Sequence, residues 1–164
     1  VAVGASNFDV QRLGDALGHA AKAGKARFEA LQNEYNLVAR NAYEPALQTV
    51  VTERDLVMLP FFGLAAGYLT GKYRTEEDFA QSVRGSRAKQ LAEANGPRML
   101  AVMDEISAET GAGLPAIALA WLVRQPGIPA PIASARTVEQ LEDLLAFTRV
   151  DLSDDQVARL TSAA

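Results

Sequence analysis

Hydroxyl and amide side chains stand at two places where a short strand is expected to end. Ser6 and Asn7 follow the apolar residues 1–5, and Gln32 ends the expected strand at 28–32. The Ser6 hydroxyl and the Asn7 amide together offer the donors and the acceptor that a carboxamide ligand needs. Gln32 is a further ligand candidate, because it would face inward at the mouth of a barrel. A turn that caps the next helix and a polar loop explain the same residues, so these interpretations stay open.

A glycine-rich segment followed by a lysine has the chemistry of a phosphate site. Gly63, Gly67 and Gly71 precede Lys72, and backbone near glycines can approach a ligand closely while its N–H groups bind an anion. The segment is not a P-loop, because alanine and tyrosine replace the first glycine and the hydroxyl residue that this motif requires. The fingerprint Gly-x-Gly-x-x-Gly does not occur, so a Rossmann site has no support.

A second anion site is suggested where an expected strand leads into a helix. Ser134, Arg136 and Thr137 stand at this junction, where a helix start would offer unpaired N–H groups and a partial positive charge. Arg136 would add a planar cationic fork. A capped surface helix with a solvated arginine explains the same residues. Gln140 either closes a capping box with Thr137 or points at a ligand.

Composition excludes several classes of site. The 164 residues suffice for one domain with a sizeable core, and the absence of cysteine excludes disulfides, thiolate catalysis and cysteine metal sites. His19 is the single histidine, so no site with several histidines can form; we expect it near the buried face of its helix, in a structural role. The net charge of −4 without a basic block makes nucleic acid an unexpected partner. No apolar run reaches the roughly 18 residues of a membrane span.

The elements that would position these residues alternate between strands and helices. A 3.6-residue period predicts a helix over residues 10–23, with Asp9 as its N-cap and Gly24 as its end. Four strands are predicted, and they are centred on Val3, Leu31, Met58 and Ile132. The other predicted helices start at Pro45, cover 97–110 and 114–125, and follow the capping-box sequences at Thr137 and Ser153. Residues 63–95 stand apart as a long Gly-rich and polar segment. Alternation of this kind predicts a parallel sheet covered by helices.

Taken in order, four segments resemble the ends of strands five to eight in the aldo-keto reductases. These segments are residues 4–8, 32–36, 64–73 and 134–143, with Ala66 and Tyr68 in place of a more usual glycine and leucine. The resemblance covers residues 1–164 and implies the second half of a (β/α)8 barrel, with the first four βα units absent and a long loop insertion near 63–96. The chain opens on Val1 without an initiator methionine, as if inside a buried strand, so we expect a fragment.

The resemblance implies an extended NADPH site without a Rossmann domain. The residues expected to hold the nicotinamide carboxamide are Ser6, Asn7 and Gln32, and Phe61 would stack on the ring. The residues expected along the pyrophosphate are Gly63, Leu64, Gly67, Lys72 and Arg84. The residues expected at the 2′-phosphate and adenine end are Ser134, Ala135, Arg136, Gln140 and Asp143. Leu144 stands where the family commonly has asparagine, which removes one expected adenine contact.

The implied activity is reduction of a small aldehyde or ketone by hydride transfer from NADPH, in a cytoplasmic enzyme without a metal. The family's catalytic Asp, Tyr, Lys and His lie on the first four strands, so we assign no catalytic residue and expect the chain alone to be inactive. We expect it to pair with its missing N-terminal half or to self-associate, because a half-barrel leaves strand edges open. Two alternatives remain: a catalytically inactive half-barrel with a binding or structural role, and an unrelated small α/β domain.

Overall fold

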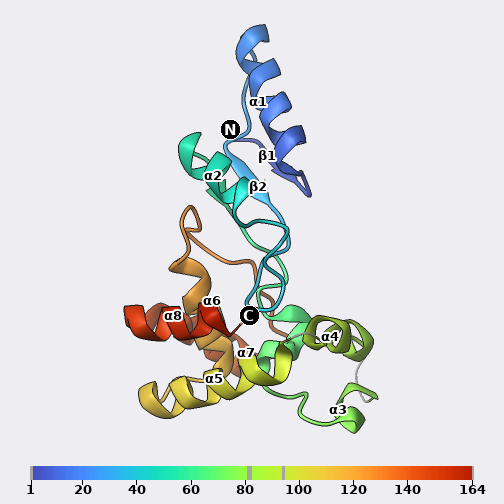
Figure 1. Ribbon diagram of the computed structural model, residues 1–164, viewed down its shortest axis with the longest axis vertical. Coiled ribbons are helices and arrows are strands. Elements are labelled where there is room, and N and C mark those ends of the chain that lie inside the picture. The colour runs from blue at the N-terminus through green and yellow to red at the C-terminus, as the bar shows by residue number, and fades with distance from the viewer. Residues whose placement is uncertain (1, 81–82, 94, 164) are drawn as a thin grey trace.

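Three short parallel strands lie side by side in the order β1-β2-β3 (Figure 1). They are β1 (Gly4–Ser6), β2 (Ala30–Gln32) and β3 (Val57–Met58). The computed structural model describes residues 2–80, 83–93 and 95–163. Val1, with which the first predicted strand begins, lies outside these residues. Strands and helices alternate as predicted, and the pairing of the three strands is parallel.

The pairing register gives the sheet one buried and one exposed face. Ala5, Leu31 and Met58 are aligned across the three strands, and all three are buried. Ser6 and Gln32 are also aligned with each other, and both side chains are exposed. Because successive side chains on a strand point to opposite faces, the polar strand ends share the uncovered face of the sheet.

The fourth predicted strand, at residues 128–134, is not assigned as a strand. The segment still runs beside β3, because the N–H of Met58 donates to the oxygen of Gly127 at 2.7 Å and that of Ile132 donates to the oxygen of Pro60 at 2.8 Å. Pro129 and Pro131 have no N–H, so they cannot complete a ladder of hydrogen bonds. The described sheet therefore has three strands, not the four of the predicted half-barrel.

The helices next to the sheet begin and end near the predicted positions. Helix α1 (Val10–Ala23) starts where a carboxylate oxygen of Asp9 accepts from the N–H of Arg12 at 2.7 Å, and it ends at Gly24 with φ 61°. Helix α2 (Ala46–Glu53) follows Pro45, which occupies the N-cap and not the first helical position. In Figure 1 these two helices lie beside β1 and β2 at one end of the molecule.

The helices of the C-terminal part of the chain gather at the other end (Figure 1). They are α5 (Gly96–Thr110), α6 (Leu114–Val123), α7 (Val138–Leu145) and α8 (Asp154–Ser162), with a 3-10 turn at Ala146–Arg149. Residues 116–122 of α6 are all buried, with the Trp121 ring fully enclosed. Among the described residues, no single helix is long and apolar enough to span a membrane; α5 and α6 pass that test only together, across a 96° bend. The capping box predicted at Ser153 is complete.

The long segment near 63–96 folds back on itself through short helices. It contains a 3-10 segment, η1 (Ala65–Thr70), and the helices α3 (Glu76–Ala80) and α4 (Gly85–Ala92). The Phe79 ring on α3 stacks on Tyr73 at 5.0 Å and on Tyr68 at 6.3 Å. This aromatic stack holds α3 against Tyr68 of η1 and against Tyr73, which follows it.

Candidate functional site

A pocket of about 730 Å³ is lined by residues 61–64 after β3, by η1, by Arg84 at the N-cap of α4, by the start of α6 and by α7 with the residues before it. Ten residues that the sequence predicted for a ligand site line this pocket: Phe61, Gly63, Leu64, Gly67, Lys72, Arg84, Ser134, Arg136, Gln140 and Asp143. They come from residues 61–72, from Arg84 and from residues 134–143, and the last of these segments lies 50 positions after Arg84. The tertiary fold therefore joins two phosphate-site candidates into one continuous pocket.

The backbone of η1 turns sharply along one wall of the pocket. Phe62, Ala65 and Ala66 have φ values of 55°, 50° and 56°, and Gly67 has φ 95°. A non-glycine residue in this region costs about 1 kcal/mol or more, so three of them close together mark a strained loop. A Cβ added to Gly67 would lie 3.1 Å from Nζ of Lys72. The missing side chain thus lets the Lys72 ammonium group lie directly over the backbone of the loop.

The charged side chains that line the pocket are three cations and one carboxylate, namely Lys72, Arg84, Arg136 and Asp143. The Lys72 ammonium also lies 4.8 Å from the centre of the Tyr73 ring, within range of a cation–π interaction. The Arg136 side chain is exposed and makes no hydrogen bond or ion pair with any described residue. An anion in this pocket would therefore meet an excess of positive charge.

Gln140, predicted either to cap a helix or to point at a ligand, forms caps. Its backbone N–H donates to Oγ1 of Thr137 at 3.3 Å, and its side-chain Oε1 accepts from the backbone N–H of Arg136 at 3.0 Å. In a capping box the Gln140 side chain would accept from the N–H of the N-cap residue, Thr137, but here it accepts from the N–H of the residue before it, Arg136. Gln140 still lines the pocket, so it holds the helix start in place beside any ligand.

Ser6, Asn7 and Gln32 form a second cluster outside this pocket, at the carboxyl ends of β1 and β2. The side-chain amide of Asn7 donates to Oγ of Ser6 at 3.0 Å, and the backbone N–H of Asn7 donates to the carbonyl of Gln32 at 3.0 Å. Asn7 has φ 57°, which asparagine tolerates better than most residues. Ala135 also does not line the pocket, because it packs against the core.

The sequence did not predict several residues that line the pocket. They are Phe62, Thr70, Gly113, Leu114, Pro115, Ile132 and Ala133, together with Leu144. Thr70 closes the η1 turn by donating to the carbonyl of Gly67 at 2.8 Å. Residues 113–115 could have been found from Gly113 and Pro115, which indicate a helix start. The start of a helix has unpaired N–H groups that can bind an anion. Nothing local indicates that this helix start faces residues 61–72.

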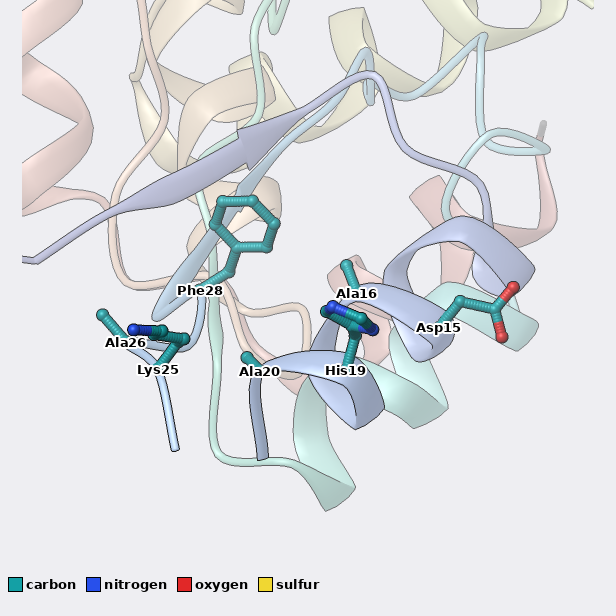
Figure 2. A pocket seen from close by; sticks show the side chains of 7 residues that line it. All are labelled: Asp15, Ala16, His19, Ala20, Lys25, Ala26 and Phe28. Carbon is teal, nitrogen blue, oxygen red and sulfur yellow. The ribbon is translucent and has the colours of Figure 1, made fainter. Parts of the chain in front are cut away.

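His19 lies in a separate, shallow pocket of about 510 Å³ between α1 and residues 25–28. Figure 2 shows Asp15 and His19 on the helix and Lys25 and Phe28 on the segment that leads to β2. His19 is exposed, so the expectation that it lies near the buried face of α1 is wrong; only Leu13 and Leu17 of this helix are buried. No group of three potential metal ligands occurs among the described residues.

Tyr35 and Tyr43 are buried in the core, and their surroundings raise the pKa of both hydroxyls. Burial raises the pKa of Tyr43 to about 12, and burial together with the Glu44 carboxylate raises the pKa of Tyr35 further. The Tyr35 hydroxyl donates to Glu44, whose other oxygen accepts from Nε of Arg40 at 2.9 Å. This cluster secures the loop after β2 beneath Trp121, whose ring centre lies 5.5 Å from that of Tyr35.

Comparison with known proteins decides the family. The model of the aldo/keto reductase family matches residues 1–164. This chain belongs to the aldo/keto reductase family. The family predicted from the four strand-end motifs is therefore confirmed, and the alternative of an unrelated α/β domain is excluded.

Related proteins support the same family. The L-glyceraldehyde 3-phosphate reductase of Escherichia coli O157:H7 is 26% identical, over 94% of this chain and 54% of its own length. The uncharacterized oxidoreductase YrpG of Bacillus subtilis is 31% identical, over 96% of this chain and 47% of its own length. This chain thus spans about half the length of these curated relatives.

A solved structure supports the fold. A thermostable aldo-keto reductase in complex with the inhibitor epalrestat superposes on 99% of this chain with a TM-score of 0.73 and 22% identity, and the chain covers 48% of it. The short described strands thus belong to an aldo-keto reductase fold. The usual glycine at position 66 has a physical reason in this structure, because Ala66 adopts φ 56°.

Proposed function

We propose that this chain is the cofactor-binding half of an NADPH-dependent aldo-keto reductase that reduces aldehydes or ketones to alcohols. In this proposal the chain supplies the part of the barrel equivalent to strands five to eight, with β1 to β3 as the first three and the extended segment at 128–134 in place of the last. The observation that carries the proposal is the pocket of about 730 Å³, in which Lys72, Arg84 and Arg136 meet the strained loop at Gly67. Bound NADPH would supply the hydride that reduces the carbonyl carbon.

The volume and the positive charge of the pocket support binding of a dinucleotide. The glycine backbone at Gly67 and the Lys72 ammonium would hold the pyrophosphate, since a side chain at position 67 would fill the space that Lys72 occupies. Arg136 and the N-terminus of α7 would hold the 2′-phosphate. Phe61, which also lines the pocket, would lie against the nicotinamide ring.

The second cluster would hold the nicotinamide carboxamide. Ser6, Asn7 and Gln32 are exposed on the uncovered face of the sheet, and their strands carry them to one edge. The Asn7 amide nitrogen already donates to Ser6, so it keeps one further N–H and its carbonyl oxygen for a ligand. These residues would orient the ring without taking part in proton transfer.

The proton for the alcohol would come from outside this chain. We assign no catalytic residue among the 164 residues, and we propose that the acid belongs to a part equivalent to the other half of the relatives. The role of the chain's own residues is then to bind and orient the cofactor. The expected cytoplasmic location stays a prediction.

A titration of the chain with NADPH, followed by nucleotide fluorescence, tests the proposal. We expect saturable binding and expect Lys72→Met to raise Kd about tenfold or more, because hydrogen bonds to charged groups contribute about 1.5–3 kcal/mol. Lys25→Met is the matched control, since Lys25 lines the shallow pocket beside α1. Absence of binding, or equal losses in both variants, would contradict the proposal.

A further inference from the structure

An ion pair joins the short helix α4 to the end of β2. Nη2 of Arg87 lies 3.1 Å and 3.2 Å from the two carboxylate oxygens of Glu34. The Glu34 side chain is 22% exposed and that of Arg87 is 48% exposed, so the pair is partly shielded from water on the glutamate side. Because shielding reduces screening, this pair is worth more than a fully exposed one.

Both partners lie next to the candidate cofactor pocket. Glu34 forms a parallel bridge with Phe61, and the N–H of Phe61 donates to the carbonyl of Asn33 at 3.1 Å. On the other side, Arg87 stands one helical turn after Arg84, whose carbonyl accepts the N–H of Ala88 at 2.9 Å. Phe61 and Arg84 both line the pocket. The ion pair therefore connects two of its walls through rigid hydrogen-bonded backbone.

The other charged contact of α4 leads away from the sheet. Lys89 pairs with Glu76 of α3, which belongs to the same long segment near 63–96 as α4. Among the ion pairs between described residues, only the one between Glu34 and Arg87 joins α4 to the sheet. The ion pair with Glu34, together with the apolar packing of α4, is thus one of the contacts that place Arg84 relative to Phe61.

We propose that Glu34 is a positioning residue: through Arg87 it holds α4 so that Arg84 lines the cofactor pocket, and it thereby slows release of the nucleotide. This inference rests on the proposed function for its ligand. Its structural part, the placement of α4 by Glu34, stands on the contacts alone. Glu34 itself does not need to contact the nucleotide.

Two measurements test the inference. With NADPH bound, stopped-flow displacement should show release about two- to fivefold faster in Glu34→Gln, which corresponds to about 0.4–1 kcal/mol, the upper part of the range for exposed ion pairs. The exchanged pair Glu34→Arg with Arg87→Glu should return the rate to within about twofold of the native one, whereas each single reversal should speed release further. Lys89→Met, two residues along the same helix, should leave release unchanged.

Hydrogen exchange of the chain without nucleotide tests the placement of α4 independently. Amides of residues 86–92 should exchange faster in Glu34→Gln and regain protection in the exchanged pair. Native protection in Glu34→Gln, or a failure of the exchanged pair to restore the native behaviour in either experiment, would overturn the inference. If the native chain does not bind NADPH, the proposed function fails, while exchange still decides whether Glu34 places α4.

Discussion

The backbone N–H of Arg136 donates a hydrogen bond of 3.0 Å to the side-chain oxygen of Gln140, four residues further along the chain. This contact fixes the entry into α7, and both residues line the candidate pocket. The backbone of Arg136 is therefore held in place by a hydrogen bond. Its guanidinium group has no ion-pair partner among the described residues. A side chain in this state can engage a phosphate without first breaking a contact.

Replacement of Arg136 by alanine should weaken NADPH binding about tenfold and NADH binding less than twofold. The contact that is lost would be to the 2′-phosphate, which only NADPH carries, and a hydrogen bond between charged groups is worth about 1.5–3 kcal/mol. Parallel titrations with the two nucleotides check this. Arg149→Ala, an exposed arginine that does not line the pocket, is the matched control. Equal weakening of both nucleotides would remove Arg136 from the proposed phosphate site.

The 164-residue chain should not reduce aldehydes with NADPH above the background rate. Loss of a positioned general acid costs about 100- to 10,000-fold, and this chain has no assigned acid. The decrease of NADPH absorbance with a simple aldehyde measures turnover, in a sample whose intact mass has been verified. Robust turnover in that sample would refute the placement of the catalytic groups outside this chain.

The chain should self-associate at tens of micromolar when no other half is present. Val138, Leu141 and Leu145 lie along one side of α7 and are 67%, 47% and 50% exposed, although all three are large and apolar. Light scattering should show dimers or larger species, because burial of such side chains favours association. Leu141→Glu should shift the distribution toward monomer, whereas Gln11→Glu on the exposed side of α1 should not. A stable monomer of the native chain contradicts this expectation.

The contact between Arg74 and Asp104 should stabilise the fold fully above about pH 4 and lose this effect as the pH falls further, through the lowered pKa of Asp104. Hydrogen bonds of 2.7 Å and 2.8 Å from the Arg74 guanidinium hold the pKa of Asp104 below its ordinary value. A pKa that is lowered by folding adds stability above the unfolded value, and this stability is lost as the pH falls through the folded value. Because both side chains are largely exposed, Asp104→Asn should lower the free energy of unfolding at pH 7 by only about 0.5 kcal/mol.

Urea unfolding at several pH values measures that difference. It should shrink as the pH is lowered below about 4, near the ordinary pKa of an aspartate. Asp151→Asn is the control, since Asp151 is exposed and makes no ion pair with described residues. A difference between Asp104→Asn and the native chain that stays constant from pH 7 to pH 3 would show that the charge of Asp104 is not what stabilises the contact.

Local patterns predicted the helices better than the strands. The ends of α1 at Asp9 and Gly24 follow from side-chain capping and from the left-handed conformation that glycine adopts, and both act within one turn of the chain. The prediction of a strand at 128–134 was wrong, because a strand needs backbone N–H groups that donate to a neighbouring segment of the chain. Pro129 and Pro131 have none, although the apolar pattern around them is that of a strand.

The sequence by itself determined the family and the residue types of the candidate site, because strand-end motifs are short and retain their order along the chain. Only the tertiary structure decided which of these residues share a pocket. The helix start at Gly113 lines the pocket although the sequence did not predict it, and Ala135 does not line the pocket although the sequence predicted it there. Both outcomes depend on how α6 and α7 pack against residues 61–72. Packing of this kind is decided by contacts between distant segments, and no spacing within one segment encodes them.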